Sequence, residues 1–386
     1  MRRNLVPALG LAVLVPLGSL ATAAVATAAP SAGALQIGSW SGGPQFDSRS
    51  RQFERCTASL NNGSGTTLTF SIDRNFRWGL GFSNPSWSFG RGHSFGVILT
   101  IGKQFQIRQT ALAVGVDRLD LQLDDSLTVF ARLRVLPQLK ATAGGMVVSF
   151  ELRDSEEIMS ALARCALQQT LPAPARPVKS KNPPRPADPL QAIERSDAMR
   201  AEASEIASDL LSFANIRDAR VLANNQTPDD LTATAHAIWR TGHVVGTVSI
   251  VPAARSAGLA ALATDLVRYG SAKCTGRFFV AAMPDQVERV AVLRLFTSCQ
   301  AEPATSSIHH TLVARAAGGI YLLTVMIDRV EYIGAMQGSA EDLDDKIRTV
   351  LPGVVARAAA HHSNSTVQPQ DAEPQQVEPQ QVEPQQ

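Results

Sequence analysis

The sequence predicts two domains, a β-rich sandwich or barrel followed by an α+β domain with an antiparallel sheet. Short segments that alternate apolar and polar residues dominate the first half of the chain, and such alternation is typical of strands with one buried face. The second half mixes strand-like segments with helical apolar spacing. A proline-dense stretch, which favours extended geometry, separates the two halves. We expect a signal peptide at 1–28, the β-rich domain at 35–169, a proline-rich linker at 170–189, the α+β domain at 190–360 and a disordered tail rich in proline and glutamine at 361–386.

The first domain is predicted to contain mainly strands, separated by clusters of Gly, Asn and Pro. The expected strands are 67–73, 95–101, 105–116, 119–123 and 146–153. A short helix is predicted from Ser126, because apolar residues follow at helical spacing. A second helix is predicted from Asp154, since Glu157 three residues later resembles a capping box. This helix would close the domain at its C-terminal end.

The second domain is predicted to combine helices with hairpins. Helices are expected over 193–213 and 259–269, and Ser339 with Asp342 is placed to cap a last helix. The expected strands are 235–240, 244–251, 276–283, 287–297, 308–314 and 320–327. Short Gly or Pro turns join them, so neighbouring strands should pair antiparallel.

The N-terminus carries the pattern of a secretory signal. Two arginines precede an apolar run from Leu5 to Leu20, and small residues follow from Ala21 to Ala29. An uncleaved anchor is the alternative, since this stretch is long enough to span a bilayer, and the arginine pair faintly suggests twin-arginine export. No later apolar stretch approaches that length, so we expect no membrane span in the mature chain.

Charge excludes one class of partner. The chain carries 36 basic and 34 acidic side chains, a net charge of +2 that falls to zero if the two N-terminal arginines are removed. Nucleic-acid binders cluster Lys and Arg to neutralise phosphates, so no nucleic-acid partner is expected.

Four cysteines are divided equally between the predicted domains. In an exported chain this predicts one disulfide per domain, Cys56 with Cys165 and Cys274 with Cys299, although four cysteines formally allow three connectivities. A hairpin turn just after 283–285 would place Cys274 and Cys299 opposite each other on its two arms. Both bridges are predicted to be structural, because neither the spacing of a redox pair nor that of a zinc site occurs.

The candidate ligand surface is an aromatic region interleaved with arginines. We single out Trp78, Trp87, Arg77 and Arg91, because aromatic platforms beside polar groups can bind sugars or peptides. The alternative is that these aromatic residues fill the core. No catalytic, cofactor-binding or metal-binding residues are predicted, and adjacent histidines such as His309 and His310 would point to opposite faces of a strand.

A segment of the first domain is similar to a known type of exported protein. The strand Val97–Lys103, a short helix near Leu127–Leu136, and Val147–Leu152 leading into a helix occur in an order that resembles bacterial proteins of the invasion-associated locus B type. The resemblance implies a small exported β-domain without known catalysis, and it carries over no functional residues. The second domain resembles no family of defined function.

These observations lead to the expectation of a periplasmic or secreted protein of two domains, without catalysis and without a cofactor, that binds an envelope protein or polymer. The alternatives are an envelope hydrolase whose site is assembled from residues distant in sequence, and a subunit of an envelope assembly.

Overall fold

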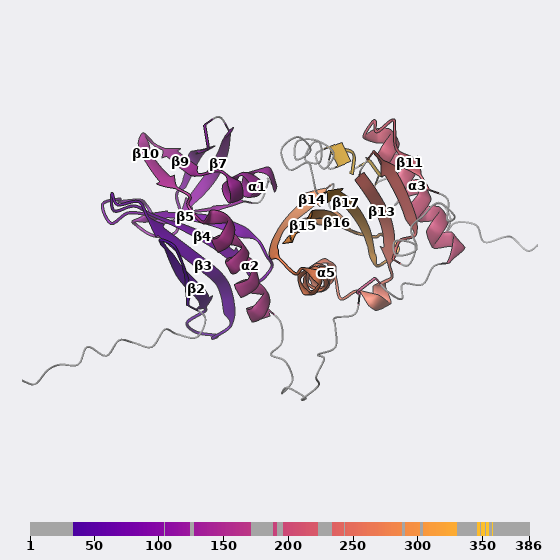
Figure 1. The fold of residues 1–386 in the computed structure, drawn as a ribbon, viewed down its shortest axis with the longest axis horizontal. Helices are drawn as coiled ribbons and strands as arrows, with labels where there is room; N and C mark the ends of the chain where they lie inside the picture. The colour runs from indigo at the N-terminus through magenta and orange to yellow at the C-terminus, as the bar shows by residue number, and fades with distance from the viewer. Residues whose placement is uncertain are drawn as a thin grey trace, which may run out of the picture.

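The computed structural model describes two β-rich halves that pack side by side (Figure 1). The described residues are 34–103, 105–123, 127–170, 188–190, 196–222, 234–242, 244–287, 290–301 and 304–329, with parts of a last helix between 346 and 357. The predicted signal peptide, most of the predicted linker, the Ser339 and Asp342 cap and the predicted tail lie outside these residues.

The first half is one antiparallel sheet of ten strands in the order β1-β2-β3-β4-β5-β8-β7-β6-β9-β10. Its strands are β1 (Leu35–Ile37), β2 (Trp40–Phe46), β3 (Phe53–Asn61), β4 (Thr67–Asp73), β5 (Trp78–Ser83), β6 (Ser94–Ile101), β7 (Phe105–Ala113), β8 (Arg118–Gln122), β9 (Gln138–Ala143) and β10 (Met146–Glu151). Strand β4 shows why these segments form a sheet with one buried face: Leu68, Phe70 and Ile72 are buried, and the residues between them are not. The predicted β-rich character is confirmed.

Two helices cover the core of this sheet, α1 (Leu127–Val135) and α2 (Ser155–Thr170). Helix α2 packs against β2, β3 and β4 and also against the strand Arg277–Val287 of the second half, and it buries Ile158 and Leu162. The Cys56–Cys165 disulfide joins β3 to α2, as the sequence predicts.

The second half is an antiparallel sheet of seven strands in the order β11-β12-β13-β17-β16-β15-β14. Its strands are β11 (Arg220–Val221), β12 (Ala237–Thr241), β13 (Val244–Val251), β14 (Arg277–Val287), β15 (Val290–Ala301), β16 (Ala304–Ala314) and β17 (Ile320–Arg329), and its helices are α3 (Asp197–Phe213), the 3-10 helix η2 (Ala253–Arg255) and α5 (Leu259–Lys273). The sheet buries both faces. Leu312 and Leu322 share a core cluster with α5, whereas the neighbouring Val313 and Leu323 share a second cluster with α3.

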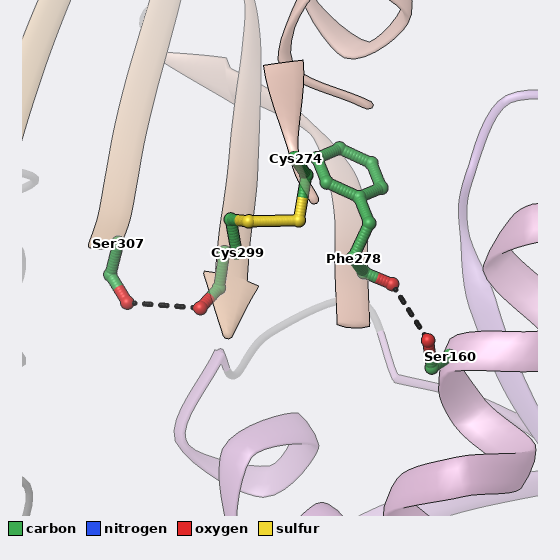
Figure 2. The surroundings of a disulfide bond; sticks show 6 residues. Ser160, Cys274, Phe278, Cys299 and Ser307 are labelled. Atoms are coloured by element: carbon green, nitrogen blue, oxygen red, sulfur yellow. Dashed lines mark hydrogen bonds between the residues drawn. A yellow bond between two sulfur atoms is a disulfide. The ribbon is translucent and has the colours of Figure 1, made fainter. Parts of the chain in front are cut away.

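The second disulfide forms, but the hairpin does not place its cysteines as predicted. Val287 pairs with Val290, so β14 continues through 283–285 and the turn lies a little later than predicted. The strand partner of Cys299 is therefore Phe278. Cys274 is the C-cap of α5, and its disulfide ties the end of that helix to β15 (Figure 2).

The two halves meet at β14, an edge strand of the second sheet. An edge strand leaves every second residue with N–H and C=O groups that point away from the sheet. The first half satisfies three such positions: the Phe278 carbonyl accepts from Ser160 Oγ (3.2 Å, Figure 2), the Val280 carbonyl accepts from Trp78 Nε1 (2.7 Å), and the Ala282 N–H donates to the Phe76 carbonyl (2.9 Å).

Two further outward positions of β14 present no open N–H group. Pro284 continues the same alternation and has no N–H to leave unpaired, which is why proline is tolerated on edge strands. The N–H of Gln286 donates to Asp285 Oδ1 (2.8 Å). The predicted end of this strand at 283 was too early, because an edge strand accommodates proline.

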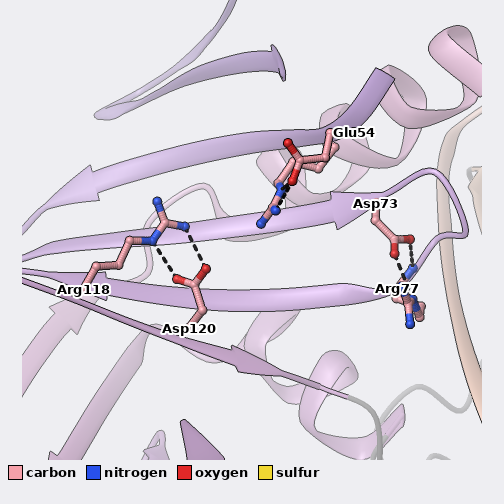
Figure 3. Close-up of polar contacts among 6 residues, drawn as sticks. Glu54, Asp73, Arg77, Arg118 and Asp120 are labelled. Carbon is pink, nitrogen blue, oxygen red and sulfur yellow. Dashed lines mark hydrogen bonds and ion pairs between the residues drawn. The ribbon is translucent and has the colours of Figure 1, made fainter. Parts of the chain in front are cut away.

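The turn between β4 and β5 supplies the Phe76 carbonyl. Asp73 accepts hydrogen bonds from the N–H groups of Asn75 (2.8 Å) and Arg77 (3.0 Å), and its other oxygen pairs with Arg77 Nε at 2.8 Å (Figure 3). Phe76 adopts a positive φ of 61°, which is costly for a bulky residue, and its side chain is 1% exposed. The bracing by Asp73 holds the Phe76 carbonyl toward Ala282.

Side chains around the strand complete the contact. Trp78 packs on Phe130 (5.2 Å between ring centroids), and Phe130 packs on Phe296 of the second half (6.0 Å). The Arg134 guanidinium lies over the Phe279 ring at 4.4 Å. One continuous core cluster consequently contains residues of both sheets.

Replacing Trp78 by Phe should lower the free energy of unfolding by about 1–3 kcal/mol, because the buried Val280 carbonyl loses its donor. Urea denaturation followed by circular dichroism measures this loss. Trp87→Phe, at a half-buried loop position, is the matched control. An equal loss in the two variants would contradict the assigned role of Trp78.

Candidate functional site

The candidate site is a polar groove of about 1080 Å³ in the first half. Its floor is a row of side chains on four neighbouring strands: Gln106 on β7, Thr100 on β6, Lys140 on β9 and Ser149 on β10. Each of these residues is the register partner of the next, so their side chains lie side by side on one face of the sheet.

The opposite wall comes from the other end of the same sheet. Leu60, Asn61 and Asn62 line it where β3 ends, together with Gly38 in the turn between β1 and β2. Asn62 is fixed by its turn, since its Oδ1 accepts from the N–H groups of Ser64 (3.0 Å) and Thr66 (3.2 Å). Its Nδ2 reaches across to the Ser149 carbonyl at 3.4 Å, so the two walls approach each other at this point.

Five ionisable side chains line the groove. Arg153 and Glu151 form an exposed ion pair at 2.9 Å, so they offset each other. Lys103, Lys140 and Asp154 have no ion-pair partner among the described residues. The groove thus presents amides, hydroxyls, two ammonium groups and one carboxylate, which suit reversible hydrogen bonding and charge pairing with a polar ligand.

The structure separates the residues of the predicted aromatic ligand surface. Trp78 is 4% exposed and bonded to β14, so it presents no ligand platform, whereas Arg77 braces the turn through Asp73 and lines a separate cavity of about 390 Å³. This part of the prediction was wrong, because the partner of the indole is the chain's own edge strand.

Trp87 and Arg91 lie apart from these two, on the segment between β5 and β6. Trp87 is half-buried and packs on Phe89 (5.3 Å), which packs on Phe95 (5.1 Å). Arg91 is exposed. Neither residue lines the polar groove.

No sequence pattern pointed to the groove. Its residues come from β3, β6, β7, β9, β10 and the four connections β1–β2, β3–β4, β6–β7 and β10–α2, and most of them are common surface types. Only the strand register brings them together, and register depends on pairing between strands distant in sequence. The polar alternation of 138–143 with 146–151 was the one local signal available.

A second polar cluster, in the second half, is structural. Glu202 on α3 accepts from Arg315 Nε (2.8 Å) and from the Tyr321 hydroxyl (2.6 Å), which ties the helix to the turn between β16 and β17. Burial, followed by the hydrogen bond to Glu202, raises the pKa of Tyr321 well above its usual range. The hydroxyl stays protonated and serves as an anchor.

The adjacent histidines of β16 are buried in the sheet. His310 Nδ1 is 3.0 Å from Thr324 Oγ1, and the His309 ring contacts the Phe296 ring at 5.1 Å. Burial, and to a lesser degree the charge of His309, lower the pKa of His310 to about 3. The His310 imidazole is neutral at ordinary pH.

Searches for a metal site, for a membrane-spanning helix and for similar proteins give no further indication of function. Among the described residues, no three or more His, Cys, Asp or Glu side chains gather closely enough to hold a metal. In the same residues no helix has the length and hydropathy to cross a membrane. No known protein family, curated protein or solved structure matches the chain.

His310 makes stability depend on pH. Its pKa is near 6.5 in the unfolded chain and about 3 in the folded one, so between these values only the unfolded chain binds the proton. Stability should therefore fall as pH drops from 6.5 toward 3, with a contribution from His310 of up to about 1.4 kcal/mol per pH unit. Urea denaturation at several pH values should show a shallower dependence for His310→Gln than for the control His93→Gln, an exposed position. Identical slopes would contradict the assignment.

Proposed function

We propose that this chain is an exported, non-catalytic binding protein whose ligand site is the polar groove of the first half. The observation that carries the proposal is the groove itself, an open cavity of about 1080 Å³ floored by hydrogen-bonding side chains from four strands. Sites that bind polar ligands present such convergent groups on a rigid scaffold.

Export is supported by the cysteines together with the N-terminal sequence. All four cysteines form disulfides, one within each half, and disulfides persist in oxidising compartments. The cationic start, apolar run and small residues of the first 29 positions have the order of a secretory signal. We therefore propose a periplasmic or secreted location and an envelope protein or polymer as the partner.

The second half serves in this proposal as a support. None of its described residues lines the groove, and its edge strand holds the face of the first half that carries Trp78 and Phe76. A ligand bound in the groove would thus be carried by a scaffold with two disulfides and a shared core.

The proposal is tested by blocking the groove. Thr100→Trp should fill the middle of the floor and weaken binding by about tenfold or more, since the ligand would have to displace a bulky ring. Thr110→Trp, on an exposed position of β7 outside the groove, is the matched control. Calorimetric titration with panels of oligosaccharides and peptides measures the affinities.

Two results would contradict the proposal. The first is equal binding by both variants, which would move the site elsewhere. The second is a chemical change in the bound oligosaccharide or peptide, detected by mass spectrometry after incubation, which would favour an envelope hydrolase.

A further inference from the structure

The four edge strands of the two sheets differ in how far they are protected against pairing with another chain. Exposed edges invite pairing with another chain, and proteins blunt them by shortening, by covering or with proline. Strand β1 has three residues and β11 has two, which leaves little to pair with. Strand β14 is covered by the first half and contains Pro284. Strand β10 is the fourth edge, with six residues and no proline.

The hydrogen bonding of the adjacent residues shows which β10 groups point outward. The N–H of Leu152 donates to the carbonyl of Pro137, the residue before β9, at 2.7 Å. The even-numbered residues of β10 therefore direct their backbone N–H and C=O groups toward β9. Val147, Ser149 and Glu151 therefore direct their N–H and C=O groups away from the sheet. The Asn62 contact on the Ser149 carbonyl, at 3.4 Å, agrees with this direction.

Most of these outward groups are available for pairing; the Ser149 carbonyl already accepts from Asn62 Nδ2 at 3.4 Å, a contact that an added strand would replace. No described residue accepts a hydrogen bond from the N–H of Val147, Ser149 or Glu151. Val147 is 55% exposed, an unusual position for a large apolar side chain on an open edge. At about 3.3 Å per residue the edge offers a pairing surface of about 20 Å.

The groove limits what can pair there. Ser149 and Glu151 form one side of it, and Asn61, Asn62 and Gly38 form the other. A second folded copy would bring its own β9 behind its β10 and collide with that far side. A single extended chain has no strand behind it, so it can enter the groove once it replaces the Asn62 contact on the Ser149 carbonyl.

The charged side chains of the groove indicate which kind of extended chain would bind. Lys140 is the register partner of Ser149, so a residue opposite Ser149 on an added strand lies about 10 Å from the Lys140 backbone, two strand spacings away. A lysine side chain and a carboxylate together span that distance. Lys103 adds a second ammonium group and Glu151 is offset by Arg153, so the two ammonium groups outnumber the one remaining carboxylate, that of Asp154.

We propose that β10 binds an extended, acidic segment of a partner protein, which adds to the sheet as an eleventh strand and lies in the groove. The segment pairs its backbone with Val147, Ser149 and Glu151 and places a carboxylate beside Lys140. This inference rests on the proposed function and names the partner class of the same site.

The test uses the full mature chain and a randomised peptide library. Sequences enriched on the wild type should carry Asp or Glu, and their affinity should fall by about tenfold or more when alternate backbone nitrogens are methylated. Ser149→Pro should cause a similar loss, because it removes an outward N–H while leaving the bonds to β9, as Pro284 does on β14. Near-ultraviolet circular dichroism and melting temperature establish that the variant is folded.

A second variant keeps the test decisive if Ser149→Pro does not fold. Val147→Lys places a charge on the exposed edge and should also weaken binding, and Thr110→Lys on an interior strand is its control.

Peptides that bind equally well after methylation, that pair two copies of the protein, or that show no enrichment would overturn the inference. Oligosaccharide binding sensitive to Thr100→Trp, without peptide binding, would overturn it and leave the proposed function intact, whereas no binding of either class would overturn both.

Discussion

The contact between Trp78 and the edge strand β14 determines how the two halves of this protein combine. A hydrogen bond of 2.7 Å from the indole to the Val280 carbonyl, with the neighbouring bonds from Ser160 and to Phe76, satisfies backbone groups that an edge strand would leave open. Buried backbone groups without partners are costly, so these bonds and the apolar contacts around Phe130 act together. The shared core cluster follows from that contact.

The need of edge strands to pair their outward backbone groups also applies to β10, the last strand of the first sheet. Three of the four edges are short or covered, and β10 combines outward backbone groups with an adjoining polar groove. The first half thus has two different surfaces, one that covers a strand of its own chain and one that borders the polar groove. The disulfides Cys56–Cys165 and Cys274–Cys299 hold the helices α2 and α5 against their sheets, so both surfaces are on cross-linked scaffolds.

Much of the secondary structure could be predicted from the sequence, because it depends on local pattern. Strands β4 and β13 have the predicted bounds, since each is a run of β-branched or alternating residues between turns. The disulfide pairs also follow from the division of cysteines. Strand β14 runs past its predicted end at 283, because proline has the same local signature in a turn and on an edge strand. The role of Trp78 and the existence of the groove depend on pairing between distant strands, which periodicity does not encode.

Site-resolved hydrogen exchange of the two edge strands tests this account most directly. The Ala282 amide, bonded to the Phe76 carbonyl, should exchange as slowly as amides in the interior of the second sheet. The Ser149 amide on β10 should exchange rapidly in the free protein, because no described group accepts its hydrogen bond. Rapid exchange at Ala282 together with strong protection at Ser149 would contradict the assignment of one edge as covered and the other as open.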